Sequence, residues 1–338
     1  MTTTNERGQT AGAGPVDFAT YGNYGAYRRR TPQGGQAGTG SFVRATYQFQ
    51  GRITAGGAGG FPAQAGRYHL YISWACPWAQ RSAIVRRLLG LQDVVSLSAV
   101  DPVRDGRGWA FRDGDGYSLD PVNGFAFLSE AYEATEPGYD GHVSVPVLWD
   151  KQTGRIVSNN FPDITIDLET QFGAFADPGV RLYPEELRPE IDALNEVVYA
   201  TVNNGVYRAG FATSQDSYEE AVAGVFGTLD DLETRLAGRR YLAGQELTEA
   251  DVRLWVTLAR FDLVYYSLFK TSVRRLTDYP NLWGYARDLY SLPAFRETTR
   301  FDQIKRHYYV TLGNVNPTRI VPVGPDLDWD SPHGRESL

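Results

Sequence analysis

The sequence predicts an α/β layer in the first half of the chain and an all-helical domain in the second half. Three observations support this prediction. Between residues 67 and 172, short runs typical of strands alternate with helical patterns. Beyond about residue 180, nearly every apolar pattern has helical spacing. The length of 338 residues suits about two domains.

The first strand and helix of the layer lie on either side of a cysteine. Residues 67–73, RYHLYIS, alternate and are rich in Tyr, Leu and Ile, which predicts a strand. The turn WACPW follows, and the next residues have apolar side chains at helical spacing that ends at Gly90, where a glycine suits a C-cap. The run VVSLSAV predicts a second strand.

The rest of the layer follows a long interruption. Residues 101–140 carry many Gly, Asp and Tyr residues, which predicts a loop insertion. SVPVLWD and RIVSNN then predict two short strands joined by a KQTG turn, and FPDITIDLETQF predicts a helix. Strand, helix, strand, insertion, two strands and helix is an order that fits a thioredoxin-like layer.

The second half of the chain is predicted to be helical, with shorter helices after Ala294. The main helices are expected near residues 185–206, 217–237, 249–268 and 281–290. One helix start is unusually complete, because Thr248 can serve as the N-cap and Asp251 stands three residues later, as in an acidic capping box. We interpret that segment as the start of a core helix and not as a catalytic acid site.

The composition shifts along the chain predict the domain boundaries. We expect a flexible N-terminal arm, a thioredoxin-like thiol-binding domain, an all-helical domain and an extended C-terminal tail that contains four prolines. These regions are residues 1–60, 61–178 (with the insertion 101–140), 179–312 and 313–338.

Charge and hydropathy exclude several classes of function. The formal net charge is -7, from 33 basic and 40 acidic residues, which argues against a nucleic-acid partner. No apolar run is long enough for a membrane span, and the N-terminus lacks the pattern of a signal peptide. We therefore expect a cytoplasmic protein. The four histidines are scattered and only one cysteine is present, so no metal site is expected.

The single cysteine, Cys76, is the first candidate for chemistry. Pro77 follows it, and proline is favoured in the first turn of a helix. Cys76 is thus predicted to lie at a helix N-terminus, where free N–H groups and the helix dipole lower the pKa of a thiol. The alternative is a small buried apolar residue, the usual role of a free cysteine. A thiol mechanism here would need its second thiol from outside the chain.

Six segments together resemble one protein family. They are WACPWAQR, GWAF, VPVLWD, VNNGVYRAGFA, LTEADVRLW and IKRHYY, the last followed by NVNPTRIVPVGP. In this order they resemble the glutathionyl-hydroquinone reductases, the Xi-class or Ecm4-like glutathione transferases, over roughly residues 40–325. The resemblance implies a thioredoxin-like domain followed by an all-helical domain, and a homodimer formed through the helical domain.

The resemblance also implies a two-step thiol reaction. The family's nucleophilic cysteine matches Cys76, whose thiolate attacks the sulfur of a thiol-conjugated hydroquinone and leaves a mixed disulfide. A second low-molecular-weight thiol then attacks that disulfide and regenerates the enzyme. Because the chain has no second cysteine, an external thiol suits the resolving step.

Two tyrosines match the family's substrate site. They are Tyr207 in NNGVYRAG and Tyr308 in KRHYY, and a phenol hydroxyl can bond the quinol oxygen or supply a proton. Tyr309 and His307 compete with Tyr308 for the second role.

Further matches concern the thiol pocket. Trp109 matches a tryptophan that lines the thiol site, although a plain core tryptophan is the alternative. Val145 and Pro146 match the valine and cis-proline of thioredoxin folds, where the valine backbone pairs with the bound thiol.

One segment departs from the family. Where the family usually reads Asn-Glu-Ser, with the Glu-Ser pair holding the γ-glutamyl group of glutathione, this chain has Asn160 and Phe161 at the last two positions. Asn160 is uncharged, Phe161 has no polar atom, and Pro162 lacks a backbone N–H. The thiol co-substrate is therefore glutathione or, with a neutral head group, mycothiol, which GC-rich actinobacteria contain.

Two other functions stay open from the sequence. A conventional glutathione transferase would conjugate a thiol to an electrophile, but such enzymes hold the thiolate with a hydroxyl and not with a cysteine. A non-catalytic binding protein of the same fold is the third interpretation, which the altered pair at 160 and 161 favours and the matching Cys76, Tyr207 and Tyr308 disfavour.

Overall fold

The computed structural model describes residues 12–24 and 40–338. The flexible arm predicted for residues 1–60 therefore lies partly outside the described residues. Within the described part of that region, Phe42 and Ile53 are buried. These two side chains anchor the segment to the body of the protein.

The first domain is built on a four-stranded mixed sheet with the strand order β2-β1-β3-β4. The central strand β1 runs parallel to β2 and antiparallel to β3, which in turn is antiparallel to β4. Every residue of β1 and β3 is buried, because these inner strands are covered on both faces. The strands are β1 (Tyr68–Ile72), β2 (Ser96–Ala99), β3 (Val147–Asp150) and β4 (Arg155–Ser158).

Three helices belong to this domain. Helix α2 (Pro77–Leu88) follows β1 and packs against α4 (Phe161–Gln171), which follows β4. Gly90 has a φ of 67°, the left-handed conformation that ends α2, as the glycine in the sequence predicts. The third helix, α3 (Ser129–Thr135), lies inside the stretch expected to be loop. That expectation missed α3 because the helix has only seven residues and no side-chain cap.

The second half of the chain is helical, as predicted. Its α-helices are α5 (Arg188–Val197), α6 (Gly205–Gly210), α7 (Gln215–Leu236), α8 (Glu249–Leu258), α9 (Tyr266–Leu268), α10 (Pro280–Ser291), α11 (Pro293–Arg296) and α12 (Phe301–Arg306). The short helix α1 (Phe18–Tyr21) belongs to the N-terminal segment. Two 3₁₀ turns, η1 (Glu185–Leu187) and η4 (Leu276–Asp278), complete the regular structure together with three π-helical segments.

Three π-helical segments are present: η2 (Val198–Asn203), η3 (Phe261–Tyr265) and η5 (His307–Thr311). The first two interrupt helices that the sequence predicts as continuous, near residues 185–206 and 249–268. An extra residue in a turn shifts the direction of the side chains that follow, and such segments are frequent at functional sites. Hydrophobic spacing alone does not reveal these interruptions, because it repeats through them almost unchanged.

The predicted capping box is confirmed at the start of α8. The backbone N–H of Thr248 donates to Asp251 Oδ2 at 2.8 Å, and both residues are buried. Asp251 also accepts from the backbone N–H of Leu242 and from the Tyr285 hydroxyl. The carboxylate therefore stabilises the start of a core helix.

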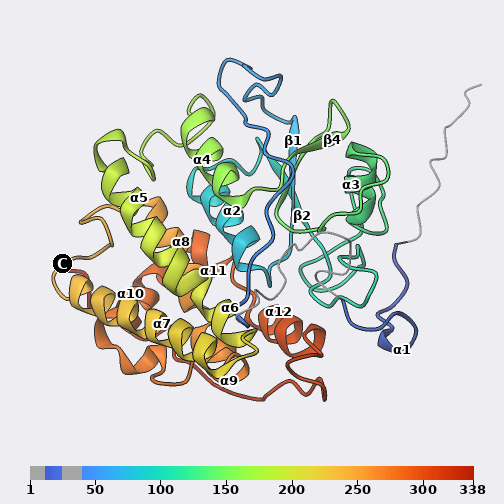
Figure 1. Cartoon of the computed structure of the whole chain (residues 1–338). Coiled ribbons are helices and arrows are strands. Elements are labelled where there is room, and N and C mark those ends of the chain that lie inside the picture. Colours follow the sequence, from blue (N-terminus) through green and yellow to red (C-terminus); the bar gives the residue numbers. More distant parts are fainter. Residues whose placement is uncertain (1–11, 25–39) are drawn as a thin grey trace, which may run out of the picture.

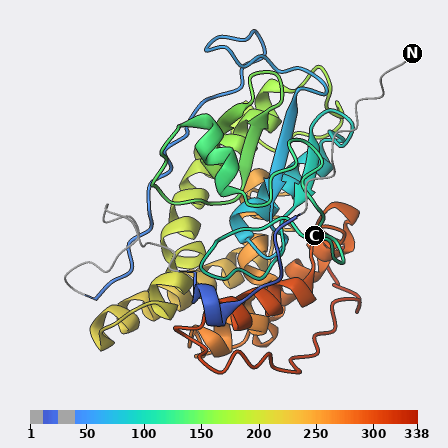
Figure 2. The same cartoon turned by 90° about the vertical axis from the view of Figure 1, so that its right-hand side faces the viewer.

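Figures 1 and 2 show the sheet and the helical domain as two parts stacked on each other. One apolar core runs continuously from the sheet into the helices. Residues 313–338, all described, carry no helix or strand and follow the helical domain. The tail is held there by Trp329, which is buried against Trp255, Trp283 and Phe301.

Candidate active site

Cys76 stands at the N-terminus of α2, as the sequence predicts. It is the N-cap residue, with extended backbone (φ -82°, ψ 118°), and Pro77 occupies the first turn. Because the helix begins there, the backbone N–H groups of Trp78 and Ala79 favour the thiolate of Cys76. The thiol Sγ donates to the Val145 carbonyl oxygen at 3.6 Å, and the Val145–Pro146 peptide bond is cis.

The predicted lowering of the Cys76 pKa is wrong for this structure. Burial raises the pKa of the Cys76 thiol, and this is the largest influence on it. The two N–H groups of α2 and the positive charges of Arg260 and Arg104 act in the opposite direction but do not outweigh burial. The helix N-terminus is present as predicted, and the depth at which it lies decides the sign of the shift.

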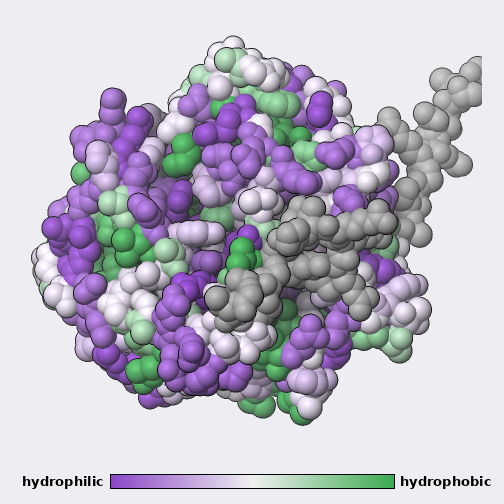
Figure 3. Space-filling view, in the orientation of Figure 1, coloured by the Kyte–Doolittle hydropathy of each residue, from purple (hydrophilic) through white to green (hydrophobic). Residues whose placement is uncertain are grey.

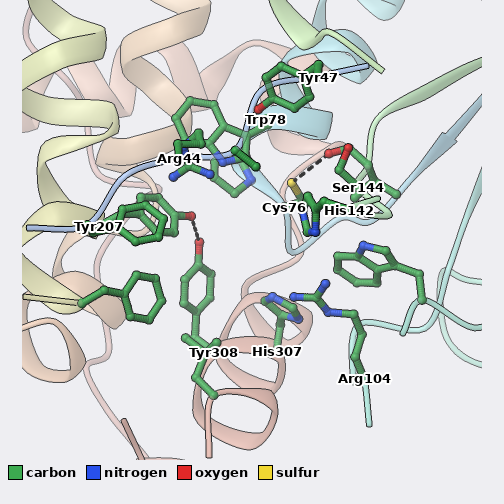
Figure 4. A pocket seen from close by; sticks show the side chains of 17 residues that line it. Arg44, Tyr47, Cys76, Trp78, Arg104, His142, Ser144, Tyr207, His307 and Tyr308 are labelled. Atoms are coloured by element: carbon green, nitrogen blue, oxygen red, sulfur yellow. Dashed lines mark hydrogen bonds between the residues drawn. The ribbon is translucent and has the colours of Figure 1, made fainter. Parts of the chain in front are cut away.

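Three tyrosine hydroxyls meet on the opposite side of the cavity. Tyr308 lies 2.5 Å from Tyr207 and 3.0 Å from Tyr265, oxygen to oxygen, and Tyr207 lies 3.4 Å from Tyr265. Figure 4 shows Tyr207 and Tyr308 pointing toward each other across from Cys76. Burial raises the pKa of all three phenols, so they stay protonated near neutral pH. The cluster can therefore donate hydrogen bonds to an oxygen in the cavity.

An arginine connects these two sides. The Arg44 guanidinium lies 4.5 Å from the centre of the Trp78 ring and 4.7 Å from that of the Tyr207 ring. Trp78 belongs to the helix that begins at Cys76, whereas Tyr207 belongs to the helical domain. The positive charge thus lies between the thiol side and the tyrosine side, where it favours a negatively charged ligand.

A second wall of the cavity consists of stacked rings. His307 and Trp109 are nearly parallel, with ring centres 5.3 Å apart, and the Arg104 guanidinium lies 4.0 Å from the Trp109 ring. His307 Nδ1 bonds the Pro102 carbonyl oxygen at 2.5 Å. Burial, aided by Arg104, lowers the pKa of His307 to about 3. His307 is therefore neutral at neutral pH, with Nδ1 as the donor.

The structure brings most of the predicted site residues into one cavity. Its lining includes Cys76, Trp109, Val145, Tyr207 and Tyr308. Pro146 is buried next to Val145 and does not line the cavity.

The three residues that compete for the second substrate-site role, Tyr308, Tyr309 and His307, differ in whether they line the cavity. His307 lines the cavity with Tyr308, whereas Tyr309 does not and instead bonds Ser267 Oγ at 2.5 Å. Of the three competitors, Tyr308 and His307 therefore line the cavity with Cys76, and Tyr309 does not.

Asn160 and Phe161 lie outside this cavity, at the start of α4. Phe161 is 2% exposed, with its ring centre 4.7 Å from that of Trp78 and 5.6 Å from that of Tyr47, whose ring is nearly perpendicular to it. Asn160 Nδ2 donates to Asp163 Oδ2 at 2.7 Å. Both residues line a separate hollow that shares only Tyr47 with the Cys76 cavity.

Comparisons with known proteins agree with this arrangement. The family profiles described as Glutathione S-transferase, N-terminal domain, and Glutathione S-transferase, C-terminal domain, match residues 75–171 and 215–288. The glutathionyl-hydroquinone reductase YqjG of Escherichia coli is 47% identical, over 88% of this chain and 93% of the relative. The chain belongs to the glutathionyl-hydroquinone reductase family of Xi-class glutathione transferases.

Solved structures and a second curated relative are similar to this Xi-class transferase along most of its length. The glutathione-bound structure of YqjG superposes with a TM-score of 0.84, at 48% identity, covering 86% of this chain and 96% of that one. The Xi transferase of Phanerochaete chrysosporium gives a TM-score of 0.82 at 45% identity, covering 84% and 97%. The reductase PcpF of Sphingobium chlorophenolicum is 46% identical over 85% of this chain and 90% of the relative. The predicted thioredoxin-like and all-helical fold is thereby confirmed.

Sequence reasoning missed three functional candidates in this Xi-class transferase. Arg44 lies in a segment expected to be a flexible arm, and Arg104 lies in the expected loop insertion, so neither was associated with the thiol. Tyr265 lies in the apolar run FDLVYYSLF, where nothing distinguishes it from the other 20 tyrosines. For Arg104 alone the sequence offered a signal, because it stands five residues before Trp109, a residue already matched to the thiol site.

Among residues 12–24 and 40–338, no three His, Cys, Asp or Glu side chains come together in a way that can hold a metal ion. In the same residues, no helix combines the length and the apolar character needed to cross a membrane.

Proposed function

We propose that this Xi-class transferase removes a low-molecular-weight thiol from thiol-conjugated hydroquinones, with glutathione or mycothiol as the thiol. The observation that supports this proposal is the position of Cys76 across one cavity from the Tyr207 and Tyr308 hydroxyls. Cleavage of the thioether bond of a quinol conjugate requires a nucleophilic sulfur and benefits from phenol hydroxyls that donate hydrogen bonds to the quinol oxygen. The curated relatives named as glutathionyl-hydroquinone reductases support the same reaction.

In the first step, Cys76 acts as the nucleophile. Its thiolate attacks the sulfur that joins the thiol to the aromatic ring, and a new S–S bond forms. The bond between that sulfur and the aryl carbon breaks, and its electron pair goes to the carbon, which takes up the proton that Cys76 has lost. The free hydroquinone leaves, and Cys76 holds the thiol as a mixed disulfide.

In the second step, an external thiol regenerates Cys76. The incoming thiolate attacks the thiol sulfur of the mixed disulfide and releases the Cys76 sulfur, which regains a proton. The products are the free enzyme and a symmetric disulfide of the low-molecular-weight thiol. The carbon–sulfur bond of the conjugate has been replaced by a carbon–hydrogen bond, the sulfur of the conjugate and that of one external thiol have been oxidised to the disulfide, and the scheme requires no metal.

The tyrosines assist the first step by binding the quinol oxygen. Because burial raises the pKa of Tyr207 and Tyr308, both phenols are donors and not phenolates near neutral pH. A hydrogen bond to an oxygen that becomes negative in the transition state is worth more than one in the ground state. The raised pKa values favour this role over complete proton transfer to the aryl carbon.

The identity of the thiol is the finer part of the proposal. The ring of Phe161 and the nitrogen of Pro162 offer no hydrogen bond to a charged amine or carboxylate at the start of α4. An unpaired polar group in such a place costs about 1–3 kcal/mol. We therefore propose that mycothiol, whose cysteine is acetylated and attached to a sugar-inositol, resolves the Cys76 disulfide faster than glutathione at equal concentration.

The test of the reaction uses synthetic conjugates of one hydroquinone with each thiol. With the second thiol omitted, one equivalent of hydroquinone should be released, and intact mass should show the thiol on Cys76. Addition of the second thiol should then restore turnover. Turnover that persists in Cys76→Ala, without any mass adduct in the wild type, would contradict the proposal and favour simple conjugation.

The test of thiol identity compares rates with both thiols on two variants. Asn160→Glu with Phe161→Ser should shift the preference toward glutathione. Because Phe161 is buried, its loss also leaves a cavity, so the melting temperature of the double variant is measured and Asn160→Glu alone serves as the matched variant. A wild type that prefers glutathione, with no gain in either variant, would support the glutathione-dependent reaction instead.

The proposal extends to assembly and location. We expect a homodimer through the helical domain, where Val197 and Val273 are 51% and 61% exposed, and the face seen in Figure 3 carries scattered apolar residues. Light scattering should give about twice the chain mass of 37.6 kDa, and a monomer mass would contradict the dimer. A cytoplasmic location suits an enzyme that consumes reduced thiol, and cell fractionation tests it.

A further inference from the structure

A buried arginine of the helical domain contacts the turn that carries Cys76. Arg260 stands between α8 and η3 and is 0% exposed, and α8 packs against α2 (Figure 1). Its Nη2 donates to the Trp74 carbonyl oxygen at 3.1 Å, and its Nε donates to the Ala75 carbonyl oxygen at 3.2 Å. Trp74 and Ala75 are the two residues that precede Cys76. Arg260 therefore holds the cysteine turn through backbone atoms.

Two further bonds fix the Arg260 guanidinium. Its Nη1 donates to the Val256 carbonyl oxygen and to Gln80 Oε1, both at 2.6 Å. Gln80 lies in the first turn of α2 and is itself fixed, because its Nε2 donates to the Thr298 carbonyl oxygen and to Thr299 Oγ1. The guanidinium thus joins the start of α2 to the end of α8 through four of its five N–H groups.

Arg260 is also connected to the tyrosine side of the cavity. Its carbonyl oxygen accepts the N–H groups of Val264 at 2.9 Å and Tyr265 at 3.3 Å, the bonds with which η3 begins. Tyr265 in turn contacts the Tyr308 hydroxyl at 3.0 Å. The side chain of Arg260 therefore holds the cysteine turn, and its backbone starts the segment that carries Tyr265.

The charge of Arg260 is matched by no carboxylate. All four of its acceptors are neutral, and among residues 12–24 and 40–338 no Asp or Glu forms an ion pair with it. An arginine keeps its charge inside a protein, and a buried charge is costly unless an opposite charge pairs with it. The described protein thus contains a buried cation next to the cysteine turn without a carboxylate counter-ion.

The Cys76 thiolate is the anion that the reaction forms beside this cation. Burial raises the pKa of the Cys76 thiol, and of the two arginine charges that act against burial, that of Arg260 is the stronger. The described lining of the cavity includes no Asp or Glu. The other charged or titratable groups around Cys76 are Arg44, Arg104, Tyr47, His142, His307 and the three clustered tyrosines.

We propose that Arg260 is a positioning residue of the reaction, which fixes the Cys76 turn through two carbonyl oxygens and whose buried charge is matched by the Cys76 thiolate. Arg260 does not line the cavity, so it acts through Cys76 and not on the substrate. It favours the thiolate both as the nucleophile of the first step and as the leaving group of the second. The inference rests on the proposed function in taking Cys76 as the nucleophile.

The experiment measures the rate of Cys76 alkylation by iodoacetamide against pH in the full-length protein. Arg260→Met removes the charge together with the four hydrogen bonds. Arg260→Lys keeps the charge, but an ammonium group cannot reproduce the planar fork that bonds two successive carbonyl oxygens. The turnover of a synthetic hydroquinone conjugate is measured on the same proteins.

We expect Arg260→Met to slow alkylation about tenfold at each pH below the Cys76 pKa, which displaces the profile upward by about one pH unit. Arg260→Lys should leave the profile close to that of the wild type. Its kcat should nevertheless fall about tenfold with KM little changed, because the charge remains while the turn loses its support. This separation of profile from kcat distinguishes the charge of Arg260 from its hydrogen bonds.

Arg335→Met is the matched control. Arg335 is 3% exposed and donates to the carbonyl oxygens of Leu236 at 3.1 Å and Arg240 at 3.0 Å, but it does not line the Cys76 cavity. Its loss should lower the melting temperature, as loss of Arg260 does, and leave the alkylation profile in place. The control therefore removes the general effect of losing a buried arginine.

A second pair of variants covers the case in which Arg260→Met does not fold. Gln80→Glu places a carboxylate at the atom that bonds Arg260 Nη1, so the charge of Arg260 is matched without Cys76. Its profile should move upward, whereas Gln80→Met, which leaves the charge unmatched, should keep the wild-type profile. Melting temperatures accompany both variants, because the bonds to Thr298 and Thr299 are lost.

An unchanged profile in folded Arg260→Met or in Gln80→Glu would overturn the inference, and so would an equal displacement in Arg335→Met. Arg260→Lys displaced as far as Arg260→Met would also contradict the part assigned to the charge. Failure of the proposed function looks different, because alkylation requires no conjugate. In that case the profiles would shift as expected while the wild type released no hydroquinone.

Discussion

The two sides of the active-site cavity are built in different ways. On the thiol side, Cys76 depends on backbone groups: the N–H groups of α2 and the carbonyl oxygen of Val145. On the tyrosine side, the side chains of Tyr207, Tyr265 and Tyr308 contact one another, and they come from positions 43 to 101 residues apart. One side is mostly local backbone geometry, and the other is wholly tertiary.

The difference has a chemical consequence. A nucleophile needs a stable position and a favourable charge environment, and a helix start with its preceding turn provides both within a few residues. A donor cluster for an oxygen must place several side chains around a point in space, and that requires packing of separate helices. The effect of a substitution on turnover should therefore be all-or-none on the thiol side and graded on the tyrosine side.

The largest expected effect comes from Cys76→Ala. It should abolish hydroquinone release, because the mixed disulfide can no longer form and no other cysteine is present in the chain. Hydroquinone release from a synthetic conjugate is measured by chromatography. Unchanged circular dichroism and melting temperature would show that the fold is intact. Residual turnover near the wild-type rate would mean that the thiol side is not the reacting side.

A pH series tests the charge environment of the thiol. Because burial raises the pKa of Cys76, the thiolate fraction at neutral pH is smaller than for a free thiol. Alkylation by iodoacetamide should be slow at pH 7 and rise about tenfold per pH unit up to pH 9. Free cysteine provides the reference rate. A rate that already levels off below pH 7 would show that the helix N-terminus outweighs burial.

Substitutions of the three tyrosines should lower kcat to different degrees. Tyr207→Phe and Tyr308→Phe should each lower kcat roughly ten- to a hundredfold, about 1.4–2.7 kcal/mol, and change thiol binding less. Tyr265→Phe should have a smaller effect, because Tyr265 does not line the cavity and acts through the other two hydroxyls. The rates should not combine additively, since the three groups share hydrogen bonds.

Tyr309→Phe is the matched control for that series. Tyr309 is adjacent to Tyr308 in sequence but bonds Ser267 outside the cavity. Wild-type rates are expected. Unchanged kinetics in Tyr207→Phe and Tyr308→Phe, or a loss in Tyr309→Phe as large as theirs, would place the quinol elsewhere.

The smallest effect is expected from His307→Gln. Since the pKa of His307 is lowered to about 3, the imidazole does not titrate between pH 5 and 9 and cannot shape the pH profile there. Loss of one neutral hydrogen bond is worth about 1 kcal/mol, or about fivefold in rate. A pH–rate profile of the variant that is displaced along the pH axis would contradict the neutral state of His307.

Several features followed from the sequence because their causes are local. Pro77 after Cys76 indicated a helix start, and Thr248 with Asp251 indicated another; both are present. The alternation of strand and helix patterns predicted the sheet domain, since the period of apolar residues depends only on neighbours along the chain. Motifs around Tyr207 and Tyr308 pointed to two side chains whose hydroxyls contact each other in the structure.

What only the tertiary structure decided is the environment of those residues. The pKa of Cys76 depends on burial beneath other elements, so a sequence rule for helix ends predicted a pKa shift of the wrong sign. Tyr265, Arg44 and Arg104 joined the site through packing of distant segments, and Phe161 proved to lie behind the wall of the cavity. Solvation and contact between separate segments are properties of the folded chain, because they depend on distances that the order of residues does not specify.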